Sequence, residues 1–393
     1  MYRTRRLLAT AMVLSVVTAA CSSASAAPQW SFAPAPSAGG AAAASPAAAV
    51  SAAAASPSPA ASASASSPAA SAMAGMPGTA SPAPAGTTSQ AVAANATADP
   101  NAPAYALRDP KAPPVMPGTV HDIELPITER DMTVAKGFVV QVWTFGGTVP
   151  GPVIRVHLGD TVNVHLTNET QMSHSIDFHA SQTAMDHQMV EIKPGATFTY
   201  TFQADYAGVW MYHCGTQPAL MHIANGMFGM VIVEPKGGID KVLGPADDEF
   251  AFVQSEWYLG AQGGAIDYAK ANSTAPQPDF VVFNGIANQY KDNPIPVRTG
   301  GRVRVFVLDA GPNLGTSFHV VGTIFDTVVK EGVVLQKGNA DGWGSQAVDL
   351  GAAQGAIVEF SPAENGMYAF VDHAFDMVTH GAIGYFQASA SGQ

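Results

Sequence analysis

The chain has 393 residues, and 18 Lys and Arg residues against 30 Asp and Glu residues give it a formal net charge of −12. This acidic balance argues against a nucleic-acid-binding protein, which needs a basic surface. The two cysteines, Cys21 and Cys214, are too few for a scaffold held together by several disulfides.

The first 27 residues are typical of an export signal. Arginines at positions 3, 5 and 6 precede an apolar segment, 7–20, which is too short for a comfortable membrane span. Cleavage after Ala26 would release a secreted or periplasmic protein. Alternatively, Thr-Ala-Ala-Cys at 18–21 resembles a bacterial lipobox, which predicts lipidation at Cys21. The chain would then be held at the cell envelope, on the outer side of the cytoplasmic membrane, with the lipid anchor as its only contact with the membrane.

Residues 28–103 form the next segment, and up to about position 100 it consists of Ala, Ser and Pro with little else. Large apolar residues do not recur in it with the period of a helix or a strand, and proline interrupts any alanine helix. We expect a disordered linker that separates a folded head from the envelope surface.

From about residue 104 the sequence becomes typical of short strands. Val-rich runs with alternating polar residues are separated by Gly, Pro, Asn and Asp, and no long amphipathic helix is indicated. The clearest runs are 137–143, 153–157, 161–166 and 196–202. This pattern predicts an all-β fold of the sandwich or barrel type.

The strand pattern occurs twice. In each half an apolar run precedes a Ser-containing motif that ends in histidine, at 173–174 and again at 317–319. In each half a Gly-led run later ends in histidine, at 208–213 and at 366–373. We therefore expect a tandem duplication of one Greek-key β-sandwich domain, with the two copies at 104–238 and 239–393.

Cys214 begins a motif with metal-binding chemistry. The spacing Cys214-x7-His222-x4-Met227 puts a thiolate, an imidazole and a thioether on one loop, and these are the soft ligands of a blue-copper electron-transfer site. A second imidazole is needed, and His174 is the natural candidate. The alternative is a buried free cysteine beside an unrelated histidine and methionine.

Strand parity predicts how the other ligands are divided. His213 and Cys214 are neighbours, so on an extended strand their side chains point to opposite sides. The same holds for His174 and His179, which are five residues apart. We therefore expect His174 to share a metal with Cys214, and His179 to share another with His213. Asp177 lies two residues from His179 and should be beside the second metal.

Four motifs resemble those of the copper-containing nitrite reductases, and the resemblance extends in order over nearly all of 104–388. The motifs are HSIDFHA at 174–180, YHCGTQPALMHIANGM at 212–227, SFHVVG at 317–322 and VDHAF at 371–375. The resemblance implies two cupredoxin domains per subunit and a homotrimer.

The resemblance also implies a role for each matching residue. It implies two copper ions per subunit, a type 1 copper held by His174, Cys214, His222 and Met227, and a type 2 copper held by His179, His213 and His373. His373 would come from a neighbouring subunit. Asp177 and His319 match the catalytic residues of the family, and Val321 falls where the family usually has Ile above the open copper position.

The implied reaction is the one-electron reduction of nitrite, NO2⁻ + 2H⁺ + e⁻ → NO + H2O, of the dissimilatory type. The implied partners are nitrite and a small electron-donor protein, either a cytochrome or another cupredoxin.

The sequence also bears on three other functions. A laccase-type oxidase builds its trinuclear copper cluster from His-x-His pairs, and the chain contains none. A non-enzymatic copper or electron-transfer lipoprotein would not need the second ligand set. A related enzyme acting on another small substrate remains an alternative.

The remaining histidines and two aromatic residues are expected to have ordinary structural roles. They are His121, His157, His165, His187, His380, Trp210 and Tyr212. For His187, which is close in sequence to the copper motifs, donor docking or extra copper binding is the alternative.

Overall fold

The structure is a computed structural model that describes residues 96–339 and 341–392. The predicted export signal, the lipidation residue Cys21 and most of the predicted linker lie outside the described residues. In the part of the chain that the structure describes, no helix is long and apolar enough to cross a membrane.

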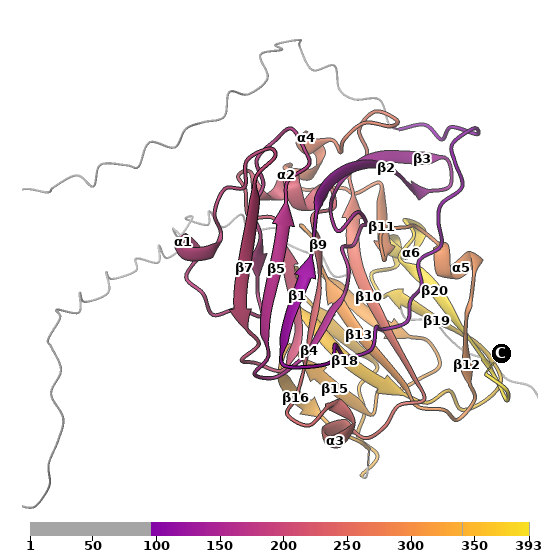
Figure 1. The fold of residues 1–393 in the computed structure, drawn as a ribbon. Coiled ribbons are helices and arrows are strands. Elements are labelled where there is room, and N and C mark those ends of the chain that lie inside the picture. The colour runs from indigo at the N-terminus through magenta and orange to yellow at the C-terminus, as the bar shows by residue number, and fades with distance from the viewer. Residues whose placement is uncertain (1–95, 340, 393) are drawn as a thin grey trace, which may run out of the picture. The chain divides into compact units, whose positions relative to one another are not determined.

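The first half of the described chain contains three sheets, with strand orders β1-β5-β7, β4-β9-β8-β6 and β2-β3 (Figure 1). The strands are β1 (Val120–Glu124), β2 (Ile127–Ala135), β3 (Phe138–Phe145), β4 (Ile154–His157), β5 (Thr161–Thr167), β6 (Asp177–Phe178), β7 (Thr197–Gln203), β8 (Gly208–His213) and β9 (Phe228–Glu234).

The second half contains two sheets, with strand orders β11-β10-β13-β18-β15-β16 and β12-β20-β19-β14-β17. The strands are β10 (Asp248–Trp257), β11 (Phe280–Phe283), β12 (Ile295–Arg298), β13 (Val303–Asp309), β14 (Thr316–Val320), β15 (Thr327–Lys330), β16 (Val333–Gln336), β17 (Ala347–Leu350), β18 (Gly355–Phe360), β19 (Gly366–Asp372) and β20 (Ile383–Ser389).

The helices of the described residues are all short, as the absence of a long amphipathic pattern predicted. They are α1 (Met185–Gln188), α2 (Ala219–Ala224), α3 (Ile239–Leu243), α4 (Tyr268–Ala271), α5 (Gln289–Asp292) and α6 (Phe375–Thr379). The predicted all-β fold is therefore confirmed.

The two halves share one strand order, which confirms the predicted repeat. In the first half β1 pairs in parallel with β5, and β5 pairs antiparallel with β7; in the second half β10, β13 and β18 do the same. The facing sheets also correspond, because β4-β9-β8-β6 matches β12-β20-β19-β14 in order and direction.

Each half buries its own apolar core, and a third core joins them. The outer face of β8 and β9, including Met211, Met230 and Ile232, packs in one cluster with Phe306 and Ile357 of the second half. Every residue of β9 is buried because both faces of its sheet are covered. β8 therefore lies between the core of the first half and the core that joins the two halves.

Contact with the folded part begins ahead of residue 104. The backbone N–H of Asp99 donates to Gly137 O over 2.8 Å, and Thr133 Oγ1 donates to Pro103 O over 3.0 Å. The chain from 99 onward therefore lies against the β2–β3 hairpin.

Candidate metal centres

The end of β8 separates two groups of polar side chains. His213 is the last residue of β8 and Cys214 follows it, so the alternation of an extended chain sends their side chains to opposite sides. Two groups with metal-ligand spacing result. The cysteine cluster is His174, Cys214 and His222, and the carboxylate cluster is Asp177, His179 and His213. This division matches the one expected from strand parity.

The cysteine cluster is fully buried and compact. The Nδ1 atoms of His174 and His222 are 3.1 Å apart, and Cys214 Sγ lies 3.9 Å and 3.4 Å from them, respectively. Met227 is buried on the same loop, where its carbonyl accepts a hydrogen bond from the Cys214 backbone N–H over 3.1 Å. Unrelated buried residues would not converge in this way, so the alternative of an isolated free cysteine is not favoured.

Thr170 and Trp143 contact the imidazoles of the cysteine cluster and fix their orientation. His174 Nε2 is 3.0 Å from Thr170 Oγ1, so Nδ1 is left free to face Cys214 and His222. The Trp143 ring meets both imidazoles edge-on, with centroids 6.0 Å from His174 and 5.1 Å from His222.

Burial keeps this cluster uncharged in the absence of a metal. It lowers the pKa of His174 to about 3, with a further contribution from His222, and that of His222 to about 4. Burial raises the pKa of the Cys214 thiol, although hydrogen bonds from Ser175 and Thr216 oppose this. Neutral imidazoles suit metal binding, and a bound cation would favour the thiolate.

The donor atoms fit one small metal ion. Ligands about 2.0–2.3 Å from a first-row metal in trigonal or tetrahedral geometry are roughly 3.3–4.0 Å from one another. The three separations in the cysteine cluster, from 3.1 to 3.9 Å, are close to this range. Two imidazoles and one thiolate with a nearby thioether are the ligand set that copper prefers for electron transfer.

The carboxylate cluster is more open to solvent. His179 Nε2 and His213 Nε2 are 3.0 Å apart, and Asp177 Oδ2 lies 3.8 Å and 4.0 Å from them. Asp177 is opposite His213 in the pairing of β6 with β8, which places its carboxylate on the same side of the sheet. About one third of the His179 side chain is exposed, so this cluster is within reach of a small molecule.

The hydrogen bond of His213 also favours metal binding at the carboxylate cluster. His213 donates from Nδ1 to Cys214 O over 3.0 Å, which leaves Nε2 unprotonated and facing His179. Burial and the charge of His213 lower the pKa of His179, and Asp177 opposes this in part. Two imidazoles beside a carboxylate can hold a cation and leave coordination positions open.

His319 and His373 form a separate pair in the second half. His319 lies on β14 and His373 directly follows the adjacent strand β19, and their ring centroids are 5.4 Å apart. His319 Nδ1 donates to Gln346 O, and His373 is exposed. Within the described part of one chain, neither belongs to the carboxylate cluster.

Val321 lies just beyond β14 and two residues after His319. Its side chain is about half exposed, and its backbone N–H donates to Ala369 O. The prediction that it borders a substrate pocket stays a prediction.

The residues expected to be structural lie outside both clusters. His121 is buried against Asp160 at 2.8 Å, and His165 bonds Asp122 at 3.0 Å. His157 lies 3.9 Å from Glu234, His187 is exposed on α1, His380 bonds Asp376 O, and Tyr212 is buried with its hydroxyl on Pro152 O. Trp210 donates to Tyr206 O.

Sequence reasoning missed Thr170 and Trp143, which orient the imidazoles of the cysteine cluster. Neither is a metal ligand by type, and both are distant from Cys214 in the sequence. A threonine four residues before His174 was the one available signal for Thr170, and nothing in the sequence marked Trp143.

Comparisons with known proteins agree with this chemistry. Residues 126–238 match the family model of the multicopper oxidases. The chain is 38% identical over 296 residues to the copper-containing nitrite reductase of Neisseria meningitidis serogroup B, covering 72% of this chain and 73% of the relative. It is 31% identical over 297 residues to that of Neorhizobium galegae, covering 69% and 76%.

A solved structure shows the same architecture. The copper nitrite reductase of Nitrosomonas europaea superimposes with a TM-score of 0.63 at 34% identity, covering 69% of this chain and 94% of that one. The fold is thus two tandem cupredoxin-like domains, and copper is the metal of the family. The chain belongs to the family of copper-containing nitrite reductases.

Proposed function

We propose that this protein reduces nitrite to nitric oxide by one electron, with two copper ions per chain. The observation that carries the proposal is the junction of the two clusters. His213 and Cys214 are adjacent residues, one in each cluster, so a single peptide unit connects them. This covalent connection is short, and it is the natural route for an electron between the two sites.

The two ligand sets suit different tasks. The buried cysteine cluster with Met227 would hold a type 1 copper, closed to substrate, and His179 and His213 would hold a type 2 copper with an open position. Copper bound at these sites would supply the electron and a coordination position for a nitrite oxygen.

Asp177 is the proposed proton donor. Its carboxylate lies within 4.0 Å of both imidazole Nε2 atoms, so an anion bound between them would be within its reach. Loss of one oxygen from nitrite as water consumes two protons, and His319 would relay the second from the solvent side. The bond from His319 Nδ1 to Gln346 O leaves its Nε2 free for this task.

A second copy of the chain would complete the type 2 site. Within one chain the carboxylate cluster has two imidazoles, whereas His373 is exposed on the other half. We infer that His373 of a neighbouring subunit supplies the third imidazole and brings His319 beside Asp177. A closed trimer satisfies this head-to-tail arrangement with three identical sites.

Export and anchoring belong to the same proposal. Lipidation at Cys21 would hold the trimer outside the cytoplasmic membrane, where a small cytochrome or cupredoxin could deliver electrons. Mass spectrometry of the mature N-terminus distinguishes a lipidated Cys21 from cleavage after Ala26.

The test is a copper count combined with a nitrite assay on the purified chain. We expect two copper ions per chain, strong visible absorption from the Cys214 thiolate, and formation of NO with a reduced dye as donor. Visible absorption without NO from a chain loaded at both sites would show an electron-transfer protein instead.

A further inference from the structure

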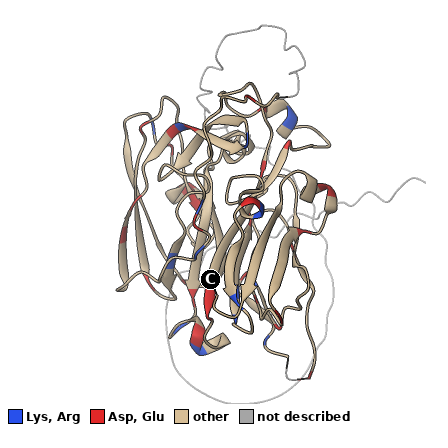
Figure 2. Ribbon diagram, turned by 90° about the vertical axis from the view of Figure 1, so that its right-hand side faces the viewer, with Lys and Arg blue, Asp and Glu red and all other residues tan. Residues whose placement is uncertain are grey.

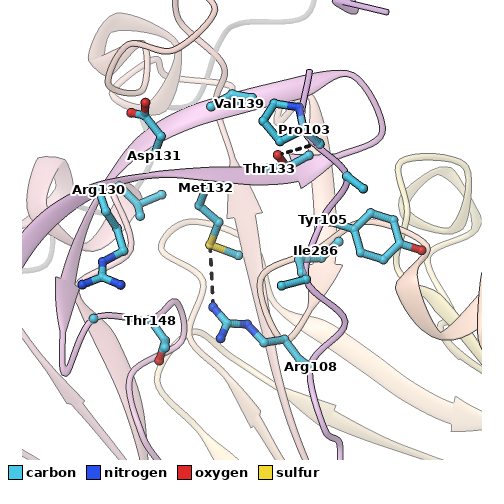
Figure 3. Close-up of a pocket in the computed structure, with 14 residues that line it drawn as sticks. Pro103, Tyr105, Arg108, Arg130, Asp131, Met132, Thr133, Val139, Thr148 and Ile286 are labelled. Atoms are coloured by element: carbon cyan, nitrogen blue, oxygen red, sulfur yellow. Dashed lines mark hydrogen bonds between the residues drawn. The ribbon is translucent and has the colours of Figure 1, made fainter. Parts of the chain in front are cut away.

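A cavity of about 350 Å³ lies away from both clusters, between the segment 103–108, the β2–β3 hairpin and the turn that carries Ile286 (Figure 3). Its size is in the range of small-molecule sites. Arg108 and Arg130 both line it, and Figure 3 shows their guanidinium groups directed toward the same part of the cavity, near Thr148.

These two arginines differ from every other arginine in the described part of the chain. That part contains six, and the four outside the cavity all form salt bridges: Arg155, Arg298, Arg302 and Arg304. Among the described residues, no carboxylate pairs with Arg108 or Arg130. In a chain of net charge −12, the only two described arginines that form no salt bridge with a described carboxylate therefore meet at one cavity.

Neither guanidinium is fully satisfied by the protein. Arg108 Nη2 donates to Val149 O over 3.4 Å and contacts Met132 Sδ at 3.9 Å, but its Nε is buried without a described partner. Arg130 makes no hydrogen bond to a described residue, and its guanidinium lies directly over Gly147, where a Cβ would be 2.9 Å from Nη2. Burial lowers the pKa of Arg108, and the positive charge of Arg130 lowers it further.

The rest of the wall is largely apolar. Met132, Val142 and Ile286 line it, while Thr148 offers a hydroxyl near the arginines. Asp131 also lines the cavity, but its carboxylate points away from both guanidinium groups in Figure 3.

We propose that this cavity binds a small organic anion. A carboxylate or phosphate head would accept hydrogen bonds from Arg108 and Arg130, whose planar donors match such groups, and an apolar body would contact Met132, Val142 and Ile286. The proposal is independent of nitrite reduction, because the cavity includes no residue of either cluster.

Calorimetric titration of the copper-loaded chain tests the proposal. Phenyl phosphate and benzoate serve as probes for the two head groups, with inorganic phosphate to test the head alone and phenol to test the body alone. We expect saturable binding of at least one aromatic anion, weaker binding of phosphate and none of phenol. Arg130→Gln should weaken binding about tenfold or more, because a charged hydrogen-bond donor is lost.

The matched control is Arg298→Gln, which removes an arginine outside the cavity and should leave binding unchanged. Arg108→Gln should weaken binding as Arg130→Gln does. Arg130 is exposed, so its replacement should not disturb folding. The proposal is overturned if neither aromatic anion binds, if the Arg130→Gln protein binds as tightly as the original, or if phosphate binds as tightly as phenyl phosphate.

Discussion

The role of Asp177 can be tested directly. Asp177 lies opposite His213 in the β6–β8 pair and two residues before His179. Its Oδ2 lies 3.8 Å from His179 Nε2 and 4.0 Å from His213 Nε2, close enough to act on a ligand bound there but too far for a hydrogen bond. This spacing suits a proton donor to substrate better than a residue that fixes the histidines.

Replacing Asp177 by Asn should lower nitrite turnover by a factor of about 10² to 10⁴, since a positioned general acid is lost. Both copper ions should remain, because no imidazole is removed. Steady-state NO formation and metal analysis are the measurements. Asp186→Asn, which changes an exposed carboxylate on α1, is the control and should have full activity. Full turnover by the Asp177 variant would show that its assigned role is wrong.

Substitution of Thr170 tests whether its hydrogen bond to His174 supports copper binding at the cysteine cluster. Thr170→Val keeps the shape of the side chain but leaves His174 Nε2 buried without its partner at 3.0 Å. We expect copper at this site to bind about 10- to 100-fold more weakly, as for other groups that orient a ligand. Competition with a chelator, followed by the visible absorption of the Cys214 thiolate, measures this. Thr170→Ser retains the hydroxyl and should bind copper as the original chain does.

At the element scale, the ends of β14 and β19 are held together by one buried carboxylate. Asp372 Oδ1 accepts from the backbone N–H groups of Ser317 and Ala374 at 3.2 Å and 3.1 Å. Its Oδ2 accepts from Gln254 Nε2 at 2.9 Å. His373 follows Asp372 directly, and its N–H donates to Ser317 O. Asp372 therefore fixes the turn that carries His373 relative to the strand that carries His319.

Asp372→Ala should release this turn and leave the backbone N–H groups of Ser317 and Ala374 and the buried Gln254 amide without this acceptor. We expect the chain to lose copper from the carboxylate cluster, by a factor of about 10 or more in affinity, while the visible absorption of the cysteine cluster is kept. Asp372→Asn should restore binding, because the amide oxygen can accept both backbone bonds and the Gln254 amide can turn to meet the Asn amide. If the Asn and Ala variants lose copper equally, charge rather than position is the function of Asp372.

Several strands could be predicted from the sequence because their signals are local. The runs at 137–143, 161–166 and 196–202 correspond to β3, β5 and β7, each within a residue or two of its bounds, apart from the last two residues of β3. Parity along the chain then separates His213 from Cys214. The hydrogen bonds of Thr170 and the meeting of Arg108 with Arg130 depend on how loops and hairpins pack, and no local pattern encodes that packing.

At the scale of the whole molecule, an ion network joins the two halves near α3, where basic and acidic residues lie close together (Figure 2). Glu249 on β10 bonds Arg155 of the first half at 2.7 Å and Arg304 of the second at 2.6 Å. Arg155 also bonds Glu234, and Arg304 also bonds Glu359. Glu249 is thus the carboxylate shared by both halves.

Removing the charge of Glu249 should destabilise the protein in a pH-dependent way. Burial alone would raise its pKa, but the hydrogen bonds and charges of Arg155 and Arg304 outweigh burial and lower it below the ordinary 4.5. A lowered carboxyl pKa stabilises the fold fully above about pH 4.5, and this contribution is lost as the pH falls through the folded value. Glu249→Gln should therefore cost roughly 2–3 kcal/mol at pH 7 and less in acid.

Chemical denaturation at pH 7 and pH 4, at one protein concentration, measures this difference. Glu129→Gln, at an exposed glutamate without a described ion pair, is the control and should change stability little. An equal cost for Glu249→Gln at both pH values would contradict the argument.

Sharing of the carboxylate cluster between subunits can be tested by mixing two inactive chains. His179→Ala spoils the first-half part of the site, and His373→Ala spoils the second-half part. If each site combines the first half of one subunit with His373 of the next, a trimer of both variants contains one intact interface out of three. Co-expression in equal amounts makes about three quarters of the trimers mixed, so about one quarter of the original nitrite turnover should return.

If His373 acted within its own chain, every site would carry one of the two substitutions and the mixture would be inactive. Two different affinity tags isolate the mixed trimers, in which turnover should then rise to about one third, because every trimer retained has one intact site.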